Sequence, residues 1–276
     1  MTIKHPIGIF DSGYGGLTVF KAITERLPEY DYIYLGDNAR APYGDHSYTA
    51  IYNYTLECVE WLFSQGCQLV ILACNTASAK ALRTIQQKIL PIKYPNHRVL
   101  GVIRPTAEVI GDLSSSKVIG VMGTRGTVNS ESYLLEINKF FPDVSVNQQS
   151  CPMWVPLVEN NEHLGRGADY FIEKYLSELL AQNTRIDTIL LACTHYPLLI
   201  PKIEEVLPEG IRLVGQGEIV AKSLQVYLEK HTEISSMLAA DGLRSFYTTG
   251  DHKVFDEHAS VFFDEEIVSL QIDMER

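Results

Sequence analysis

Two cysteines of this 276-residue chain stand in nearly the same sequence context. Cys74 follows the apolar run at residues 69–73, and Cys193 follows the run at residues 188–192. Each run is typical of a buried strand, and the polar residues after each cysteine are typical of a helix N-terminus. The positive end of a helix dipole stabilises a thiolate, so a cysteine at this position is suited to acid–base chemistry. The recurrence of this context predicts a function for both thiols.

Two thiols on opposite faces of a carbon acid could remove a proton from one side and deliver one from the other. This inverts a stereocentre, and the reverse reaction requires only that the thiols exchange protonation states. A redox pair is an alternative, but a disulfide needs Cα atoms within about 7 Å and leaves no room for a substrate between the sulfurs. A nucleophilic hydrolase built on Cys193 and His195 is another alternative, and it leaves Cys74 unexplained.

Polar residues beside the two thiols suit such a carbon-acid site. Asp11 opens the glycine-rich turn DSGYGG, which lacks the ending and the spacing of a phosphate loop, and its carboxylate better suits an ammonium group or a neighbouring acid or base. The pairs Asn75-Thr76 and Thr194-His195 could anchor a substrate carboxylate or cap a helix. We expect His195 to tune the protonation of the nearby thiol.

Composition argues against several other classes of protein. The formal charge is −11, from 34 acidic and 23 basic residues, which disfavours nucleic acid and anionic membranes as partners. The chain starts without an apolar signal segment and its apolar runs are too short to span a bilayer, so we expect a cytoplasmic protein. Cys58, Cys67 and Cys151 are expected to be buried thiols. Cys193 and His195 lie close together but have no partner ligand pair, which makes them only a weak signal for a zinc site.

Short apolar runs alternate with segments of helical period along the whole chain. This alternation predicts an α/β fold with mostly parallel sheets flanked by helices. The segments at residues 47–65 and 167–182 are expected to be amphipathic helices. The expected strands are residues 7–10, 32–36, 69–73, 99–103, 118–122, 188–192 and 212–215.

Matching turns recur at similar offsets and indicate two similar α/β domains. Ile7 and Ile119 open matching stretches 112 positions apart, and Cys74 and Cys193 are 119 positions apart. We expect a first domain of residues 1–98 and 214–276 and a second of residues 99–213, with the crossing at 88–98 and the return near 215–217. Ligands of parallel sheets bind at the carboxyl ends of the strands. The active site is therefore expected in the cleft between the domains.

Six motifs occur together in one order: IGIFDSGYGGLTV, YLGDNARAPYG, LACNTAS, GVMGTRGT, PLVE and LLACTHYPLL. Together they resemble the glutamate racemases over about residues 7–197. The resemblance implies a two-domain enzyme that interconverts L- and D-glutamate with two cysteines, without pyridoxal phosphate or metal. It further implies that D-glutamate is destined for peptidoglycan, and it is compatible with a homodimer.

The resemblance also implies roles for individual residues. Cys74 would take the α-proton of D-glutamate and Cys193 that of L-glutamate. Asp11 and His195 would assist the thiols, and Glu159, by itself an ordinary surface residue, would support the histidine. The residues implied to line the substrate site are Asp11, Ser12, Pro42, Tyr43, Gly44, Cys74, Asn75, Thr76, Thr124, Cys193, Thr194 and His195.

One segment departs from the family pattern. Where relatives often read something like IDSGEAVA, residues 213–220 read LVGQGEIV, so contacts and effector behaviour there cannot be carried over. The nearest rival function is a racemase of aspartate or another small acid, because one methylene changes discrimination by only about 1–3 kcal/mol. A two-lobed binding protein that closes on an amino acid without reacting is a rival of a different class.

Overall fold

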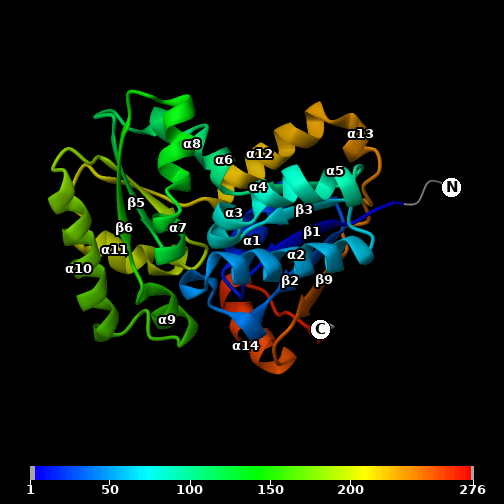
Figure 1. Cartoon of the computed structure of the whole chain (residues 1–276). Coiled ribbons are helices and arrows are strands. Elements are labelled where there is room, and N and C mark those ends of the chain that lie inside the picture. The colour runs from blue at the N-terminus through cyan, green and yellow to red at the C-terminus, as the bar shows by residue number, and fades with distance from the viewer. Residues whose placement is uncertain (1–3, 275–276) are drawn as a thin grey trace.

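The computed structural model describes residues 4–274 and contains two sheets in which every strand pair is parallel (Figure 1). The strands are β1 (Ile7–Asp11), β2 (Tyr32–Gly36), β3 (Leu69–Leu72), β4 (Arg98–Gly101), β5 (Val118–Gly123), β6 (Ser145–Ser150), β7 (Thr188–Ala192), β8 (Arg212–Val214), β9 (Arg244–Thr248) and β10 (Ser269–Gln271). The predicted α/β class is confirmed.

Helices cover both sheets. They are α1 (Gly16–Arg26), α2 (Tyr48–Ser64), α3 (Asn75–Lys80), α4 (Leu82–Thr84), α5 (Leu90–Lys93), α6 (Ile103–Ala107), α7 (Arg125–Asn129), α8 (Ser132–Phe140), α9 (Trp154–Glu159), α10 (Arg166–Gln182), α11 (Ile200–Val206), α12 (Gly217–Lys230), α13 (Thr232–Ser235) and α14 (His252–Phe263). Short turns of 3-10 or π type are η1 (Asn38–Arg40), η2 (Tyr43–Asp45), η3 (Ile85–Ile89), η4 (Ile110–Leu113) and η5 (Tyr196–Leu199). None of the helices within residues 4–274 combines the length and the apolar character needed to cross a membrane.

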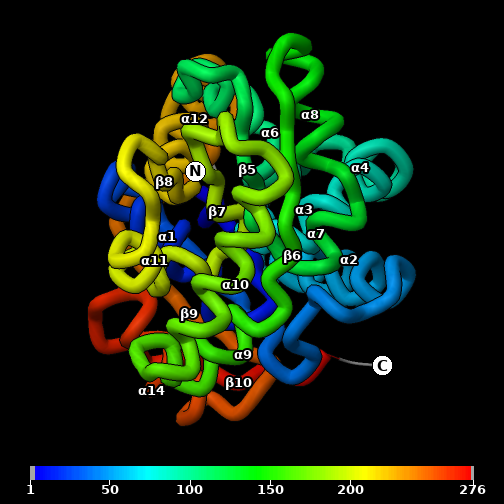
Figure 2. The backbone as a smooth tube through the Cα atoms, turned by 90° about the vertical axis from the view of Figure 1, so that its left-hand side faces the viewer, coloured from blue at the N-terminus to red at the C-terminus, as the bar shows by residue number. Residues whose placement is uncertain are grey.

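The two sheets repeat one topology. The order is β10-β9-β2-β1-β3-β4 in the six-stranded sheet and β6-β5-β7-β8 in the four-stranded sheet. The order β2-β1-β3-β4 of the first sheet therefore recurs as β6-β5-β7-β8 in the second, and Figure 2 shows these last four strands side by side. In each sheet the chain moves to one side of the first strand and then to the other, which creates a switch point beside that strand.

The chain crosses between the sheets later than the expected boundary at residue 98. Residues 88–98, expected to form the crossing, instead contribute the end of η3, then α5 and the first residue of β4. Strand β4 pairs with β3 as the edge of the first sheet, from Leu69 opposite Arg98 to Leu72 opposite Gly101. An apolar run alone does not reveal which sheet accepts its hydrogen bonds, so the sequence misassigned this strand. We propose that the outward crossing follows Gly101 and contains α6.

The return crossing lies after β8. Helix α12 begins at Gly217 and packs against α1, where a Cβ added at Gly217 would lie 3.1 Å from the Cβ of Ala22. The chain then adds β9 next to β2 and β10 next to β9, which widens the first sheet. We propose that residues 4–101 and 215–274 form one domain and that the four-stranded sheet with its helices forms the other.

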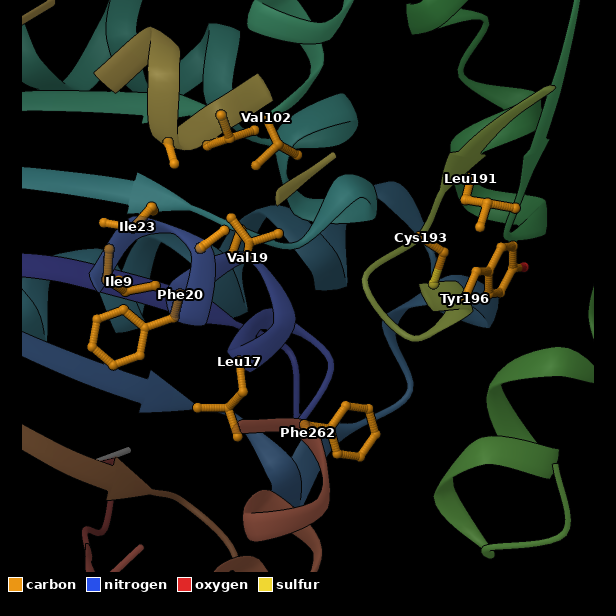
Figure 3. Close-up of a cluster of buried hydrophobic side chains, with 14 of the residues drawn as sticks. Ile9, Leu17, Val19, Phe20, Ile23, Val102, Leu191, Cys193, Tyr196 and Phe262 are labelled. Carbon is orange, nitrogen blue, oxygen red and sulfur yellow. The ribbon is translucent and has the colours of Figure 1, made fainter. Parts of the chain in front are cut away.

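The burial of each strand explains whether it could be predicted from the sequence. All residues of β1, β3 and β7 are buried, so these strands appear as continuous apolar runs. Strand β6, with the sequence SVNQQS, was missed because it is a partly exposed edge strand that carries mostly polar side chains. Residues of both lobes share one hydrophobic cluster (Figure 3), which includes Phe20 and Phe262 from the first and Leu191 and Tyr196 from the second.

Candidate active site

Cys74 lies at the switch point of the first sheet. It follows β3, the neighbour of β1. Its sulfur caps α3 by accepting a hydrogen bond from the backbone N–H of Ala77 at 3.4 Å, and its S–H donates to Oγ of Ser12 at 3.5 Å. Only 5% of the residue is exposed. The cap and the Ser12 contact hold the thiol at the end of the β1 and β3 strands.

Cys193 occupies the equivalent place in the second sheet. It follows β7, the neighbour of β5, and 7% of it is exposed. Its sulfur lies 3.9 Å from Nδ1 of His195. Figure 3 shows Cys193 in the turn between β7 and the segment that carries Tyr196. The repeated topology thus explains why both sheets carry a thiol-bearing turn. The expected helix N-terminus is present only after Cys74, because Cys193 is followed by a turn and the 3-10 segment η5.

The loop after β1 contacts the turn that carries Cys193. The hydroxyl of Thr194 lies 3.4 Å from Oδ2 of Asp11, and the hydroxyl of Thr18 donates to the carbonyl oxygen of Thr194 at 2.9 Å. A Cβ added at Gly15 would lie 2.4 Å from both Nδ1 of His195 and Oγ1 of Thr194. The lobes therefore meet at Gly15 with no room for a larger residue.

Cys193 and Glu159 keep the imidazole of His195 protonated. Its Nε2 lies 2.9 Å from Oε1 of Glu159, at the end of α9, and its Nδ1 faces Cys193. Burial disfavours the imidazolium, but the contacts with Cys193 and Glu159 outweigh it and raise the pKa of His195 to about 10. At neutral pH a positive charge therefore stands beside the sulfur of Cys193.

The environment of Cys74 is different. Burial, followed by the negative charge of Asp11, raises the pKa of the Cys74 thiol to about 12, and Cys193 contributes in the same direction. Burial also raises the pKa of the Asp11 carboxyl, although the charge of His195 opposes this. Cys74 is a thiol at neutral pH.

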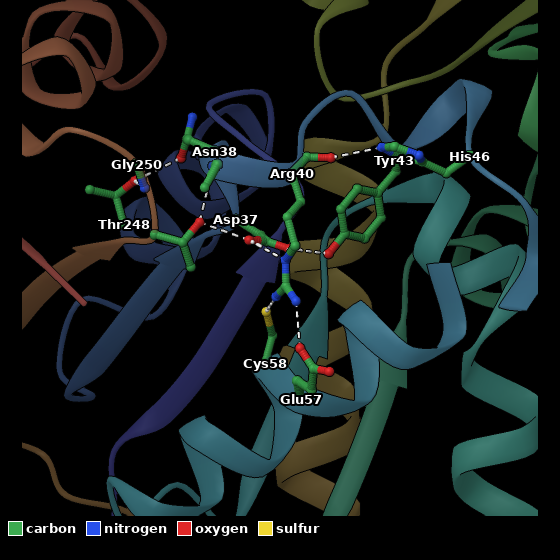
Figure 4. A network of polar contacts seen from close by, with 11 residues as sticks. Asp37, Asn38, Arg40, Tyr43, His46, Glu57, Cys58, Thr248 and Gly250 are labelled. Atoms are coloured by element: carbon green, nitrogen blue, oxygen red, sulfur yellow. Dashed lines mark hydrogen bonds and ion pairs between the residues drawn. The ribbon is translucent and has the colours of Figure 1, made fainter. Parts of the chain in front are cut away.

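The loop of Pro42, Tyr43 and Gly44 is held by the buried carboxylate of Asp37, which was not among the expected site residues. Asp37 is fully buried and accepts hydrogen bonds from the Tyr43 hydroxyl and from Nε of Arg40 (Figure 4). The side chain of Tyr43 thus points into the first lobe, and the backbone is the part of this loop that faces the other lobe. A Cβ at Gly44 would lie 3.0 Å from Cβ of Thr124.

Three threonine hydroxyls join the lobes beside this loop. Thr76 lies 3.0 Å from Thr124 and 3.4 Å from Thr127, and Thr124 donates to Thr127 at 3.2 Å. Thr124 also caps α7 through the backbone N–H of Thr127. Thr127 was not expected at the site, and its place three residues after a capping threonine is the signal that could have revealed it. Asn75, by contrast, is tied to Gln216 and Tyr133.

The arrangement brings most of the expected residues together. Direct contacts link Asp11, Cys74, Ser12, Cys193, Thr194, His195 and Glu159 in one group and Gly44, Thr76 and Thr124 in a second. One protonated thiol, a second thiol next to an imidazolium, and a carboxylate able to accept from an ammonium group form a set that can move a proton across a carbon. All five cysteines are free thiols.

Comparisons with known proteins bear on this set of residues. The profile of the Asp/Glu/Hydantoin racemase family matches residues 7–224. A glutamate racemase of Sulfurihydrogenibium sp. is 39% identical over 253 residues, which cover 91% of each chain. The crystal structure of a glutamate racemase from Bacillus anthracis superimposes with a TM-score of 0.88 at 32% identity, covering 98% of this chain and 97% of that one. The structure of a Francisella tularensis glutamate racemase in complex with D-glutamate superimposes with a TM-score of 0.87 at 30% identity. The match covers 99% of this chain and 98% of that one.

Proposed function

Because this chain belongs to the Asp/Glu/hydantoin racemase family and is therefore an amino-acid racemase, we propose that it interconverts L- and D-glutamate by a two-cysteine proton transfer at Cα. One observation carries the proposal. Each sheet supplies one thiol at its switch point, and the lobes meet where the two thiol-bearing turns lie. The names of the relatives support glutamate as the substrate.

In the direction from L- to D-glutamate, the thiolate of Cys193 removes the α-proton. The electron pair of the Cα–H bond remains on Cα, and the S–H of Cys74 donates its proton to the opposite face. The products are D-glutamate, a Cys193 thiol and a Cys74 thiolate, so charge and protons balance. The raised pKa of Cys74, about 12, supports its role as the acid in this direction. The reverse reaction uses the same groups with protonation states exchanged.

His195 and Asp11 assist the two thiols. The imidazolium of His195 lies 3.9 Å from the Cys193 sulfur, where it stabilises a thiolate, and Glu159 keeps the ring charged and oriented. The charge of Asp11 favours the protonated form of Cys74.

The remaining residues bind and orient the substrate. Asp11, with Ser12 beside it, suits the α-ammonium group. Hydrogen-bond donors from Asn75, Thr76 and Thr194, together with the backbone of the Pro42–Gly44 loop and the Thr124 hydroxyl, suit the two carboxylates. Tyr43 contributes through the position of its backbone, because its hydroxyl is bound to Asp37.

The proposal is tested with Cys74→Ser and Cys193→Ser, each of which should abolish racemisation while the circular dichroism spectrum stays that of the native fold. The matched control is Cys67→Ala, a buried thiol in the core of the first lobe, which should keep its activity. Full racemisation by either serine variant would disprove the two-thiol mechanism. Reaction of L-aspartate in place of L-glutamate would instead correct the substrate.

The proposal extends to the biological setting. D-Glutamate from this enzyme would supply peptidoglycan synthesis in the cytoplasm, without a metal or pyridoxal phosphate. Expression of the chain should allow a bacterium that requires D-glutamate to grow without it. We further propose a homodimer of the 31.0 kDa chain, which sedimentation velocity distinguishes from a monomer. A single monomeric boundary at high protein concentration would refute the dimer alone.

A further inference from the structure

Three buried side chains form a closed ring of hydrogen bonds beside Cys74. Nδ2 of Asn75 donates to Oε1 of Gln216 at 2.7 Å, Nε2 of Gln216 donates to the Tyr133 hydroxyl at 2.6 Å, and that hydroxyl donates to Oδ1 of Asn75 at 2.5 Å. Each member donates one bond and accepts one. Closed chains of this kind strengthen their members in a medium of low dielectric constant.

The ring joins three parts of the molecule, and Gln216 connects it to a fourth. Asn75 opens α3 at the end of the first sheet, Tyr133 lies on α8 over the second, and Gln216 precedes α12 at the return crossing. The second N–H of Gln216 points to Oγ1 of Thr106 at 2.9 Å, with the carbonyl oxygen of Val102 at 3.4 Å. Since Thr106 lies on α6, Gln216 also ties the return crossing to the outward crossing.

Burial makes it unfavourable to leave any member of the ring unpaired. Asn75 and Gln216 are each 3% exposed, and Tyr133 is fully buried. Loss of one partner would leave a buried donor or acceptor unpaired, which is unfavourable. Burial also raises the pKa of Tyr133 above its ordinary value, so its hydroxyl stays protonated and can donate. The Thr106 hydroxyl donates to the carbonyl oxygen of Val102 at 2.9 Å and so can only accept from Gln216. This contact sets the orientation of the Gln216 amide and, through the ring, that of the Asn75 amide.

One N–H of Asn75 remains for a ligand. The ring uses a single N–H of this amide, and no other acceptor within residues 4–274 takes the second one. Asn75 directly follows Cys74 in the chain. A donor held rigidly at that position is suited to a carboxylate of the substrate, because the ordering of the side chain has already taken place before binding.

We propose that Gln216 and Tyr133 are positioning residues that orient Asn75 so that its free N–H binds a carboxylate of the amino-acid substrate; this rests on the proposed function. Gln216 stands in the segment LVGQGEIV, where the chain departs from the family pattern. The family resemblance therefore could not predict the contact between Gln216 and Asn75. The proposal gives the segment at residues 213–220 a role in substrate binding, which it performs through Asn75.

The test compares Tyr133→Phe and Gln216→Met with Tyr32→Phe. The hydroxyl of Tyr32 donates to the carbonyl oxygen of Leu27 at 2.7 Å and the residue is almost fully buried, so its removal deletes a similar bond that is not part of the ring. Both ring variants should raise the KM for glutamate about tenfold with kcat within about threefold, because the lost contact acts in the ground state and transition state alike. Tyr32→Phe should change neither constant.

The double variant and a binding measurement separate the outcomes. Tyr133→Phe combined with Gln216→Met should raise KM little more than either change alone, because both act through Asn75. If wild-type protein racemises glutamate and both ring variants keep its KM, or lose only kcat, the positioning role is wrong. If either ring variant fails to fold, the other gives the KM readout. Wild-type protein that neither binds nor racemises glutamate would overturn the proposed function itself.

Discussion

Replacement of Glu159 by glutamine tests whether this carboxylate sets the charge of His195. Oε1 of Glu159 lies 2.9 Å from Nε2 of His195, and the side chains are 21% and 5% exposed. A hydrogen bond to a charged partner contributes about 1–2 kcal/mol more than a neutral one, and glutamine keeps only the neutral bond. At about 1.36 kcal/mol per pH unit, the pKa of His195 should fall from about 10 to about 9.

Two assays measure this change. An NMR titration of the imidazole resonances follows the protonation of His195 directly. In the pH profile of kcat/KM for L-glutamate, the alkaline limb should move down by about one pH unit. The control is Glu233→Gln, which alters an exposed pair in which Oε1 of Glu233 lies 3.0 Å from Nδ1 of His231. That variant should leave the activity profile unchanged. A Glu159→Gln protein with an unshifted His195 titration would refute the assignment of the charge to this pair.

Two further substitutions test the contact between the lobes and a buried hydrogen-bond network. Gly15→Ala places a Cβ 2.4 Å from Nδ1 of His195 and should cost about 1–3 kcal/mol of stability together with most activity, whereas Gly167→Ala, with open space around it, should stabilise or leave the protein unchanged in thermal melts. Asp187 accepts hydrogen bonds from Ser114 and its neighbours; these outweigh the opposing effect of burial and lower its pKa to about 2. Asp187→Asn should therefore lose about 1–2 kcal/mol in urea unfolding at pH 7, a difference that disappears as the pH falls from about 4 to about 2; an equal loss at pH 2 would contradict it.

The sequence predicted the central strands of the fold because those strands are buried on both faces. Runs such as those of β1, β3 and β7 carry an apolar residue at almost every position. The edge strand β6 has no such pattern, and the assignment of β4 to a sheet depends on long-range pairing that no local pattern contains. Strands β9 and β10, at the other edge of the first sheet, were not predicted either. Local patterns thus reveal the buried central strands but neither the edge strands nor the sheet to which a strand belongs.

The candidate site follows the same division. Cys74 and Cys193 could be found from the sequence because the repeated turn places each at the end of a central strand. Asp37 and Gln216 could not be found in this way, because each one only orients a predicted residue. Asp37 binds the Tyr43 hydroxyl, and Gln216 binds Asn75 from a distant part of the chain. Residues that orient other residues carry no motif of their own, and only the folded structure identifies them.

The most direct test of the two-thiol mechanism is the isotope content of the first product. L-Glutamate is mixed with the protein in D₂O in the presence of a chelator and without added cofactor, and both enantiomers are analysed before a tenth of the substrate has reacted. Cys193 should remove protium and Cys74 should deliver solvent deuterium, so the D-glutamate should carry deuterium at Cα while the remaining L-glutamate keeps its protium. D-Glutamate that retains the protium of the substrate would show a single base acting on both faces and would contradict the account.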